Sequence, residues 1–211
     1  MRSNGQRAAT RITGNFGYYT VKYGAAAGSA HSFIPPAFHG PYHKRDQNAM
    51  AIVVSKPLPE FDAKATGEVQ VTNVSHLGQA VVLYFYPKDN TPGCTTEAMQ
   101  FRDKYKEFVK LGAEVFGVSR DNMKSHDDFK AKLELPFELI ADTEEKMCHM
   151  FGVVKNKIMY GKKVKGIERS TFLVGADGLV AQEWRGLKVP GHVDEVLKAV
   201  KALKSPVKKV A

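Results

Sequence analysis

The clearest pattern in the chain is a continuous apolar and β-branched run, Ala80 to Tyr86, that ends at Pro87. A run of this kind predicts a strand buried on both faces of a mainly parallel sheet. Apolar residues then recur at helical spacing from Phe101 to Leu111, and Gly112 is the kind of residue that ends a helix in a left-handed cap. The pattern therefore predicts a strand followed by a helix.

The same alternation continues toward the C-terminus. A second strand is expected at Ala113 to Val118, and a polar helix at Met123 to Leu133 ends before Pro136. The remaining expected elements are a helix at Thr143 to Phe151, a lysine- and glycine-rich connection at 155–166, strands at Ser170 to Val174 and Leu179 to Trp184 joined by the turn Ala176-Asp177-Gly178, and an amphipathic helix at His192 to Leu203. Strand and helix in alternation predict the α/β class.

The first 49 residues follow neither the helical nor the strand period. We expect residues 1–49 to be a disordered extension, or a stretch upstream of the working start, and residues 50–211 to be one domain. The net charge of +9 does not change this picture, because six basic residues face a single acid within 1–49 and both signs mix in the remainder. We therefore expect no nucleic-acid partner. No apolar run reaches the length of a membrane span, so a cytoplasmic protein is expected.

The chemistry is concentrated between Tyr86 and Glu97, which join the first buried strand to the first long helix. In an open α/β sheet, ligands bind at this carboxyl edge of the strands. Thr91 and Pro92 suit an N-cap and a first helical residue, which places Cys94 in the first turn. The free N–H groups and the helix dipole there favour a thiolate, and so lower the pKa of the cysteine. A small buried hydrophobe is the structural alternative, but a cysteine at a helix start is not expected to pack a core.

These residues resemble the active-site motif of the peroxiredoxins, with Pro87, Thr91 and Cys94 at the motif spacing. The likeness extends to the bacterioferritin comigratory protein or peroxiredoxin Q subgroup. It covers roughly residues 51–203, through Phe85 to Asp89, Thr91 to Thr95, Phe101 to Asp103, Gly117 to Ser119, Tyr160 to Lys162 and Arg169 to Leu173. The resemblance implies a thioredoxin-like fold with a mixed sheet flanked by helices, and a thiol-dependent peroxidase that reduces hydrogen peroxide and organic hydroperoxides.

Carried over by position, the resemblance implies that Cys94 is the peroxidatic cysteine and that Thr91 holds its side-chain oxygen near the sulfur and the peroxide. Arg169 would stabilise the thiolate and polarise the peroxide, while Pro87 would screen the pocket and Gly93 would border the substrate. Donors fixed in advance suit this reaction, because negative charge develops on the leaving oxygen. No cofactor is expected. No metal is expected either, since the histidines are scattered and Cys148 and His149 are adjacent rather than at ligand spacing.

One departure concerns the second thiol. Well-known members of the subgroup carry a resolving cysteine five positions after the first, where this chain has Met99. Cys148 is the other cysteine; we interpret it as a packed core residue, with a resolving role as the alternative. We therefore expect a one-cysteine cycle that depends on a small thiol or a thioredoxin-type reductant, in a monomer or weak dimer.

Three other functions remain open at this point. A thiol-disulfide oxidoreductase of the same fold needs a Cys-x-x-Cys pair, but Glu97 occupies the fourth position. A cysteine hydrolase needs a histidine base near Cys94, for which His126 and His192 are candidates. A redox-inactive binding protein is compatible with the fold alone.

Overall fold

The computed structural model describes residues 52–159 and 162–204. Its elements are, in chain order, β1 (Asp62–Lys64), a 3-10 turn (Thr66–Glu68), β2 (Gln70–Thr72), β3 (Ala80–Phe85), α1 (Pro92–Lys110), β4 (Ala113–Ser119), α2 (Met123–Leu133), β5 (Glu138–Ala141), α3 (Lys146–Met150), β6 (Val154–Met159), β7 (Lys162–Ile167), β8 (Ser170–Val174), β9 (Val180–Arg185) and α4 (His192–Lys204). The expected extension at 1–49 lies outside the described residues.

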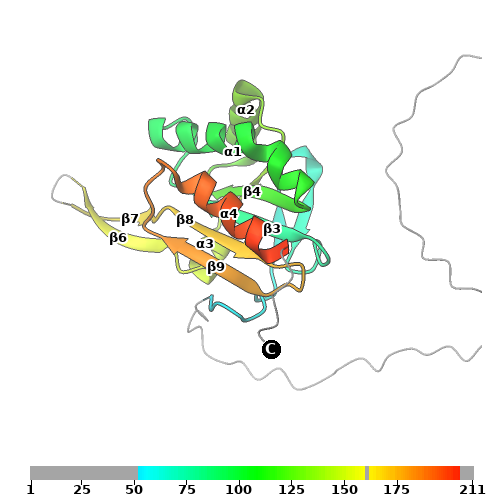
Figure 1. The fold of residues 1–211 in the computed structure, drawn as a ribbon. Coiled ribbons are helices and arrows are strands. Elements are labelled where there is room, and N and C mark those ends of the chain that lie inside the picture. The colour runs from blue at the N-terminus through cyan, green and yellow to red at the C-terminus, as the bar shows by residue number, and fades with distance from the viewer. Residues whose placement is uncertain (1–51, 160–161, 205–211) are drawn as a thin grey trace, which may run out of the picture. The chain divides into compact units, whose positions relative to one another are not determined.

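A five-stranded sheet in the order β5-β4-β3-β8-β9 forms the centre of the domain (Figure 1). The pairs β3–β4 and β4–β5 are parallel, whereas β3–β8 and β8–β9 are antiparallel. The sheet is therefore mixed, and β3 is its central strand. Because β8 runs antiparallel to β3, Phe85 at the end of β3 pairs with Ser170 at the start of β8. This register brings the residue before β8 to the edge of the sheet where α1 begins.

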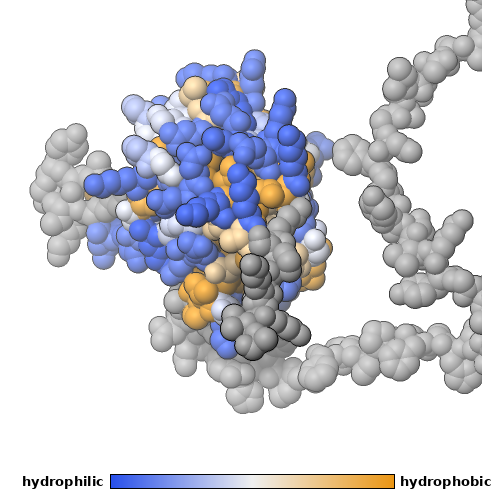
Figure 2. Space-filling model, in the orientation of Figure 1, coloured by the Kyte–Doolittle hydropathy of each residue, from blue (hydrophilic) through white to orange (hydrophobic). Residues whose placement is uncertain are grey.

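Side chains alternate across β3 and divide the core into two layers. Val82, Tyr84 and Tyr86 belong to the cluster that includes side chains of α1, α2 and α4. Val81, Leu83 and Phe85 belong to a second cluster that includes α3 and the segment leading into the hairpin of β6 and β7. The sheet thus separates two cores. On the face shown in Figure 2, hydrophilic residues cover most of the surface over α1 and α2, because these helices turn their apolar sides toward the sheet.

Several predicted elements match the structure closely. The helix at Met123–Leu133 and the strand at Ser170–Val174 have the expected bounds. Gly112 has a φ of 63°, so the left-handed end of α1 is confirmed. Gly178, with a φ of 77°, lies in the turn between β8 and β9, as the Asp-Gly pair predicted.

Other predictions were wrong. The lysine- and glycine-rich stretch at 155–166 is not a plain connection, because β6 and β7 form a two-stranded antiparallel hairpin. Lys155, Asn156 and Lys165 are exposed, and the lysine-rich sequence of the two strands shows no regular apolar alternation. Helix α3 is shorter than the expected Thr143 to Phe151. Strand β5 was missed, because four residues after Pro136 are too few to show a period.

None of the helices in residues 52–159 and 162–204 is both long and apolar enough to cross a membrane.

Candidate active site

A buried hydrogen-bond network around Asp89 holds the loop that precedes α1. The Tyr86 hydroxyl donates to Asp89 Oδ1 at 2.8 Å, and the Ser125 hydroxyl donates to Asp89 Oδ2 at 2.7 Å. His126 Nδ1 lies 2.9 Å from the same Oδ2, and its Nε2 lies 3.2 Å from the carbonyl oxygen of Ile140. Burial alone would raise the pKa of Asp89, but the bonds from His126, Ser125 and Tyr86 outweigh it and hold that pKa below its ordinary value. The network ties the loop to α2.

Helix α1 begins as the sequence predicts, with Thr91 at the N-cap and Pro92 in the first helical position. The Thr91 side chain does not cap the helix, however. Its hydroxyl donates to the Lys88 carbonyl at 3.0 Å, so the expectation that it serves as the cap acceptor was wrong. The hydroxyl is therefore hydrogen-bonded within the loop and not to an N–H group of the helix. The role of Thr91 toward the peroxide stays a prediction.

Cys94 lies in the first turn of α1, as predicted, but it is only 2% exposed and packs within the core cluster of Tyr84, Tyr86 and Phe101. The expectation that a cysteine at this helix start would not pack a core was therefore wrong. The reason is geometric: α1 starts directly over the carboxyl end of β3, so its first inward-facing residue already meets the aromatic layer. Burial strengthens every charge interaction that the sulfur makes.

Arg169 reaches the sulfur from the residue before β8. Its Nη2 donates to Cys94 Sγ at 3.2 Å, and its Nη1 forms an ion pair with Glu97 Oε2. The guanidinium side chain is 15% exposed. A planar fork can bind two acceptors at once, which a lysine ammonium cannot do with the same geometry. Arg169 therefore links the thiol to a buried carboxylate, and its positive charge favours the thiolate over the thiol.

Glu97 is a residue that sequence reasoning treated only as the absence of a second cysteine. It is fully buried one helical turn after Cys94, on the same side of α1. Burial raises the pKa of Glu97 to about 7, although the charge and hydrogen bond of Arg169 act to lower it. The signal that could have found it is an acid at helical spacing from the reactive thiol, followed by the aromatic core residue Phe101.

Gly93 and Pro87 are the two residues that the sequence predicted to line the substrate pocket. Gly93 is exposed, and a Cβ on it would lie 3.4 Å from Arg169 Nη2. A side chain here would therefore crowd the guanidinium. Pro87 is partly buried directly after Tyr86. The substrate-binding roles of both residues remain predictions.

His192, the first residue of α4, also lies close to this site. Its Nε2 is 2.7 Å from Thr171 Oγ1, and its ring makes edge contacts with Phe101 and Trp184. Burial, reinforced by the charge of Arg169, lowers the pKa of His192 to about 4. Within the described residues, neither His192 nor His126 is hydrogen-bonded to Cys94 Sγ. The arrangement expected of a cysteine hydrolase is therefore not formed.

Cys148 lies on the other face of the sheet. It is fully buried in the second core cluster, with Met147 and Phe151, which confirms its interpretation as a packed core residue. Burial, with the nearby Asp142 carboxylate, raises the pKa of Cys148 far above its ordinary value and keeps it a thiol. Both cysteines are free.

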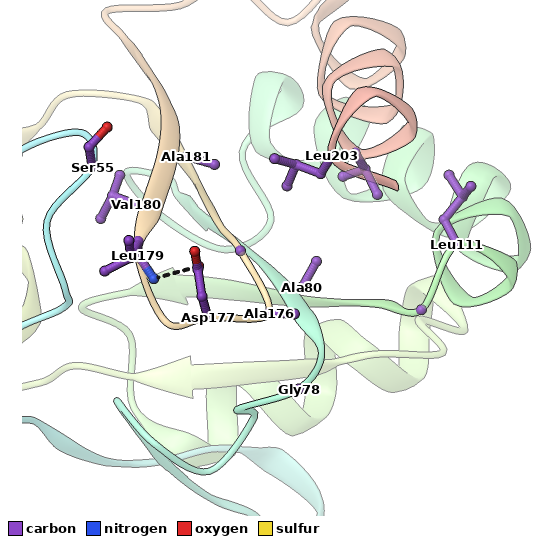
Figure 3. Close-up of a pocket in the computed structure, with 13 residues that line it drawn as sticks. Ser55, Gly78, Ala80, Leu111, Ala176, Asp177, Leu179, Val180, Ala181 and Leu203 are labelled. Atoms are coloured by element: carbon purple, nitrogen blue, oxygen red, sulfur yellow. Dashed lines mark hydrogen bonds between the residues drawn. The ribbon is translucent and has the colours of Figure 1, made fainter. Parts of the chain in front are cut away.

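The pocket of Figure 3 is not part of this site. Its volume is about 590 Å³, and its lining includes Ala80, Leu111 and Leu203. Ala80 begins β3, whereas Cys94 follows the other end of that strand, which is about 17 Å long. No group of three or more metal-ligating side chains is found in the part of the chain that the structure describes.

A buried cysteine at a helix start, in contact with an arginine above the carboxyl end of the central strand of a mixed sheet, is the arrangement of a thiol enzyme of the thioredoxin-like class. Residues 54–183 match the family model described as the AhpC/TSA family, and the chain belongs to that family. The resemblance to the bacterioferritin comigratory protein or peroxiredoxin Q subgroup is confirmed by the curated relatives.

Two of these relatives are named peroxiredoxin Bcp. The one from Xanthomonas campestris is 51% identical over 152 residues, which cover 71% of this chain and 95% of the relative. The one from Bacillus subtilis is 45% identical over 152 residues, which cover 72% of this chain and 97% of the relative.

Solved structures agree with the curated relatives. Xanthomonas campestris peroxiredoxin Q has a TM-score of 0.65 at 52% identity, covering 67% of this chain and 90% of that one. Mycobacterium tuberculosis peroxidoxin BcpB has the same TM-score at 28% identity, and the match covers 73% of this chain and 99% of that one. Another Xanthomonas structure concerns the alkyl peroxide reduction activity of its bacterioferritin comigratory protein. Xanthomonas structures also exist with serine replacing the cysteine at position 48 or at position 84 of that protein.

The depressed pKa of His192 predicts a specific pH dependence of stability. Between pH 4 and 6.5 the unfolded chain binds the His192 proton more readily than the folded chain, so this residue makes the free energy of unfolding rise with pH across that window. We expect the stability advantage of the wild type over His192→Gln to grow by up to about 3 kcal/mol from the acid end of the window to the neutral end. Urea unfolding at the two ends measures it.

The carboxyl of Glu97, whose pKa is raised, contributes a slope of the opposite sign, but it is present in both proteins and cancels in the difference. A stability difference that stays constant across the window would show that His192 is not held neutral by its surroundings.

Proposed function

We propose that the chain is a thiol-dependent peroxidase in which Cys94 is the peroxidatic cysteine, acting on hydrogen peroxide and organic hydroperoxides. The observation that carries this proposal is the 3.2 Å contact from Arg169 Nη2 to Cys94 Sγ in the first turn of α1. Membership of the AhpC/TSA family supports the peroxidase chemistry, and the Xanthomonas relative's alkyl peroxide reduction activity supports the substrate class.

The reaction is a displacement at oxygen. The Cys94 thiolate attacks the terminal hydroxyl oxygen of the peroxide and forms a sulfur–oxygen bond. At the same time the O–O bond breaks, and its electron pair goes to the leaving oxygen. That oxygen takes up a proton and departs as water or an alcohol, leaving a sulfenic acid on Cys94. The Arg169 fork, fixed by Glu97 on one side, is in place to stabilise the charge that moves from sulfur to oxygen.

The alternative functions lack their required parts. A thiol-disulfide oxidoreductase needs a second cysteine where Glu97 is buried against Arg169. A hydrolase needs a histidine on the nucleophile, but His126 binds Asp89 and His192 binds Thr171. A redox-inactive binding protein does not require a buried guanidinium in contact with a thiol. Burying such a charge is costly, so this arrangement speaks against that function.

We further propose that the oxidised cysteine is reset by an external thiol. Met99, in the position of the expected resolving cysteine, is a 37% exposed residue of α1. That position offers no thiol in this chain.

Cys148 is not available to the folded protein as a partner. A disulfide requires two Cα atoms within about 7 Å, and the five-stranded sheet lies between the cluster of Cys94 and the cluster of Cys148. A bond between them would require both α1 and α3 to leave the core. A small thiol or a thioredoxin-type protein acting directly on Cys94 fits the structure better. A monomer or weak dimer remains our expectation for the assembly.

The assignment of Cys94 makes a direct prediction. Cys94→Ser should abolish peroxide turnover, because a serine hydroxyl is not ionised at neutral pH and cannot form a sulfenic acid. Peroxide consumption with dithiothreitol as the reductant measures this. The variant should keep its fold, since the exchange removes little volume, and thermal unfolding provides the control. Substantial remaining turnover in the folded variant would show that another group reduces the peroxide.

The one-cysteine cycle predicts that Cys148→Ala keeps most of the turnover. The loss should be confined to stability, on the order of 1 kcal/mol, because a small buried side chain is truncated in a packed core. Non-reducing mass spectrometry of the oxidised wild type should show no bond between Cys94 and Cys148. Such a bond in good yield, together with lost turnover in Cys148→Ala, would instead establish a two-cysteine cycle with local unfolding.

A further inference from the structure

The buried part of the site holds one permanent cation and two groups that can become anions. Arg169 binds Cys94 Sγ through Nη2 and Glu97 Oε2 through Nη1. Cys94 and Glu97 are both excluded from solvent. If both were ionised, the site would carry a net negative charge in a medium that penalises it. With one proton shared between them, the site is neutral.

The surroundings of the second carboxylate oxygen of Glu97 also indicate that one proton is shared between Cys94 and Glu97. Within the described residues, Glu97 Oε1 and the Tyr84 hydroxyl are buried without a hydrogen-bond partner. A buried carboxylate that leaves one oxygen unpaired is costly, whereas a protonated carboxyl places less charge on that oxygen. The groups that face Glu97 are Cys94 on α1, Tyr84 on β3 and Arg169 before β8, while His192 on α4 faces Arg169.

We propose that Glu97 is the proton store of the peroxidatic step: it takes up the proton that Cys94 loses on ionising, and releases one when the sulfur becomes neutral again by oxidation. The inference rests on the proposed function and goes beyond it, since it assigns a role to a residue outside the peroxiredoxin motif. Glu97 acts through the charge that it shares with Arg169, so it is a positioning residue rather than a group that contacts the peroxide.

The proton balance closes at every stage. When Cys94 ionises, its proton moves to the Glu97 carboxylate, so the reduced protein at rest holds a thiolate and a neutral carboxyl. Attack forms the sulfur–oxygen bond, breaks the O–O bond and places the electron pair on the leaving oxygen. As that oxygen gains a proton and Glu97 loses one, the products are a sulfenic acid, a carboxylate and water or an alcohol. The site remains neutral throughout, because Arg169 balances one negative charge in each state.

This arrangement has a pH limit that follows from burial. Burial raises the pKa of Glu97 to about 7, so its proton exchanges in the neutral range. Above that pKa the proton of Glu97 is lost to solvent, and oxidation must then draw one proton back. Below that pKa, at about pH 6, oxidation should draw none.

The test compares the wild type with Glu97→Gln, which keeps the shape of the side chain but cannot hold the proton. Reduced protein is mixed with one equivalent of hydrogen peroxide in weak buffer with an indicator dye, and proton uptake is divided by the sulfenic acid found by intact-mass spectrometry. We expect no uptake per oxidised sulfur in the wild type at about pH 6, below the pKa of Glu97, and close to one in Glu97→Gln. Glu183→Gln is the matched control, since it neutralises a different glutamate paired with an arginine and should behave as the wild type.

Infrared difference spectra provide a readout that does not require the Glu97 variant to fold. Oxidation of the wild type at about pH 6, below the pKa of Glu97, should remove a protonated-carboxyl band, and peroxide added to Cys94→Ser should produce no carboxyl change. Uptake of one proton per sulfenic acid in the wild type, or the absence of a carboxyl change, would overturn the proton store while leaving the peroxidase intact. Failure of Cys94 to form a sulfenic acid would instead overturn the proposed function.

Discussion

The active site depends on one interaction, the guanidinium of Arg169 placed between the Cys94 sulfur and the Glu97 carboxylate. The two acceptors belong to α1, and the donor lies 75 residues after Cys94 along the chain. The antiparallel pairing of β3 with β8 makes this contact possible. The pairing of Phe85 with Ser170 fixes the position of Arg169, the residue just before β8, at the end of β3. The reactivity of the cysteine is therefore a property of the sheet register as much as of the helix start.

The same sheet explains why the two thiols of the chain have different chemistry. Cys94 lies beside a cation at the edge of the first core, where a thiolate is stabilised. Cys148 lies beside the Asp142 carboxylate in the second core, where burial and the nearby negative charge both oppose ionisation. In the proposed mechanism, one residue type serves as a nucleophile on one face of the sheet and as packing on the other. This separation is the reason that we propose an external reductant.

Local signals in the sequence were sufficient for the elements that form the frame of the site. Thr91, Pro92 and Cys94 mark the start of α1, because capping preferences act over a few residues. The position of Arg169 came from the family resemblance, since a contact made by strand pairing leaves no local pattern. The helical spacing of Glu97 from Cys94 was a local signal, but its ion pair with Arg169, which comes from the segment before β8, was not visible in the sequence. The hairpin of β6 and β7 escaped prediction because its lysine-rich sequence shows no regular apolar alternation.

The central claim is that Arg169 promotes attack by the Cys94 thiolate, and the pH-dependent rate of Cys94 oxidation tests it most directly. Rapid-quench mixing with hydrogen peroxide, followed by intact-mass spectrometry, gives that rate for the wild type, for Arg169→Lys and for Arg185→Lys. Arg185 is a matched control, because it also pairs with a glutamate at the edge of the sheet but does not contact the sulfur. We expect Arg169→Lys to lower the rate about 100-fold and to move its rise to higher pH, since a point charge cannot serve both acceptors. Arg185→Lys should leave the rate unchanged. A wild-type rate and pH profile in Arg169→Lys would contradict the account.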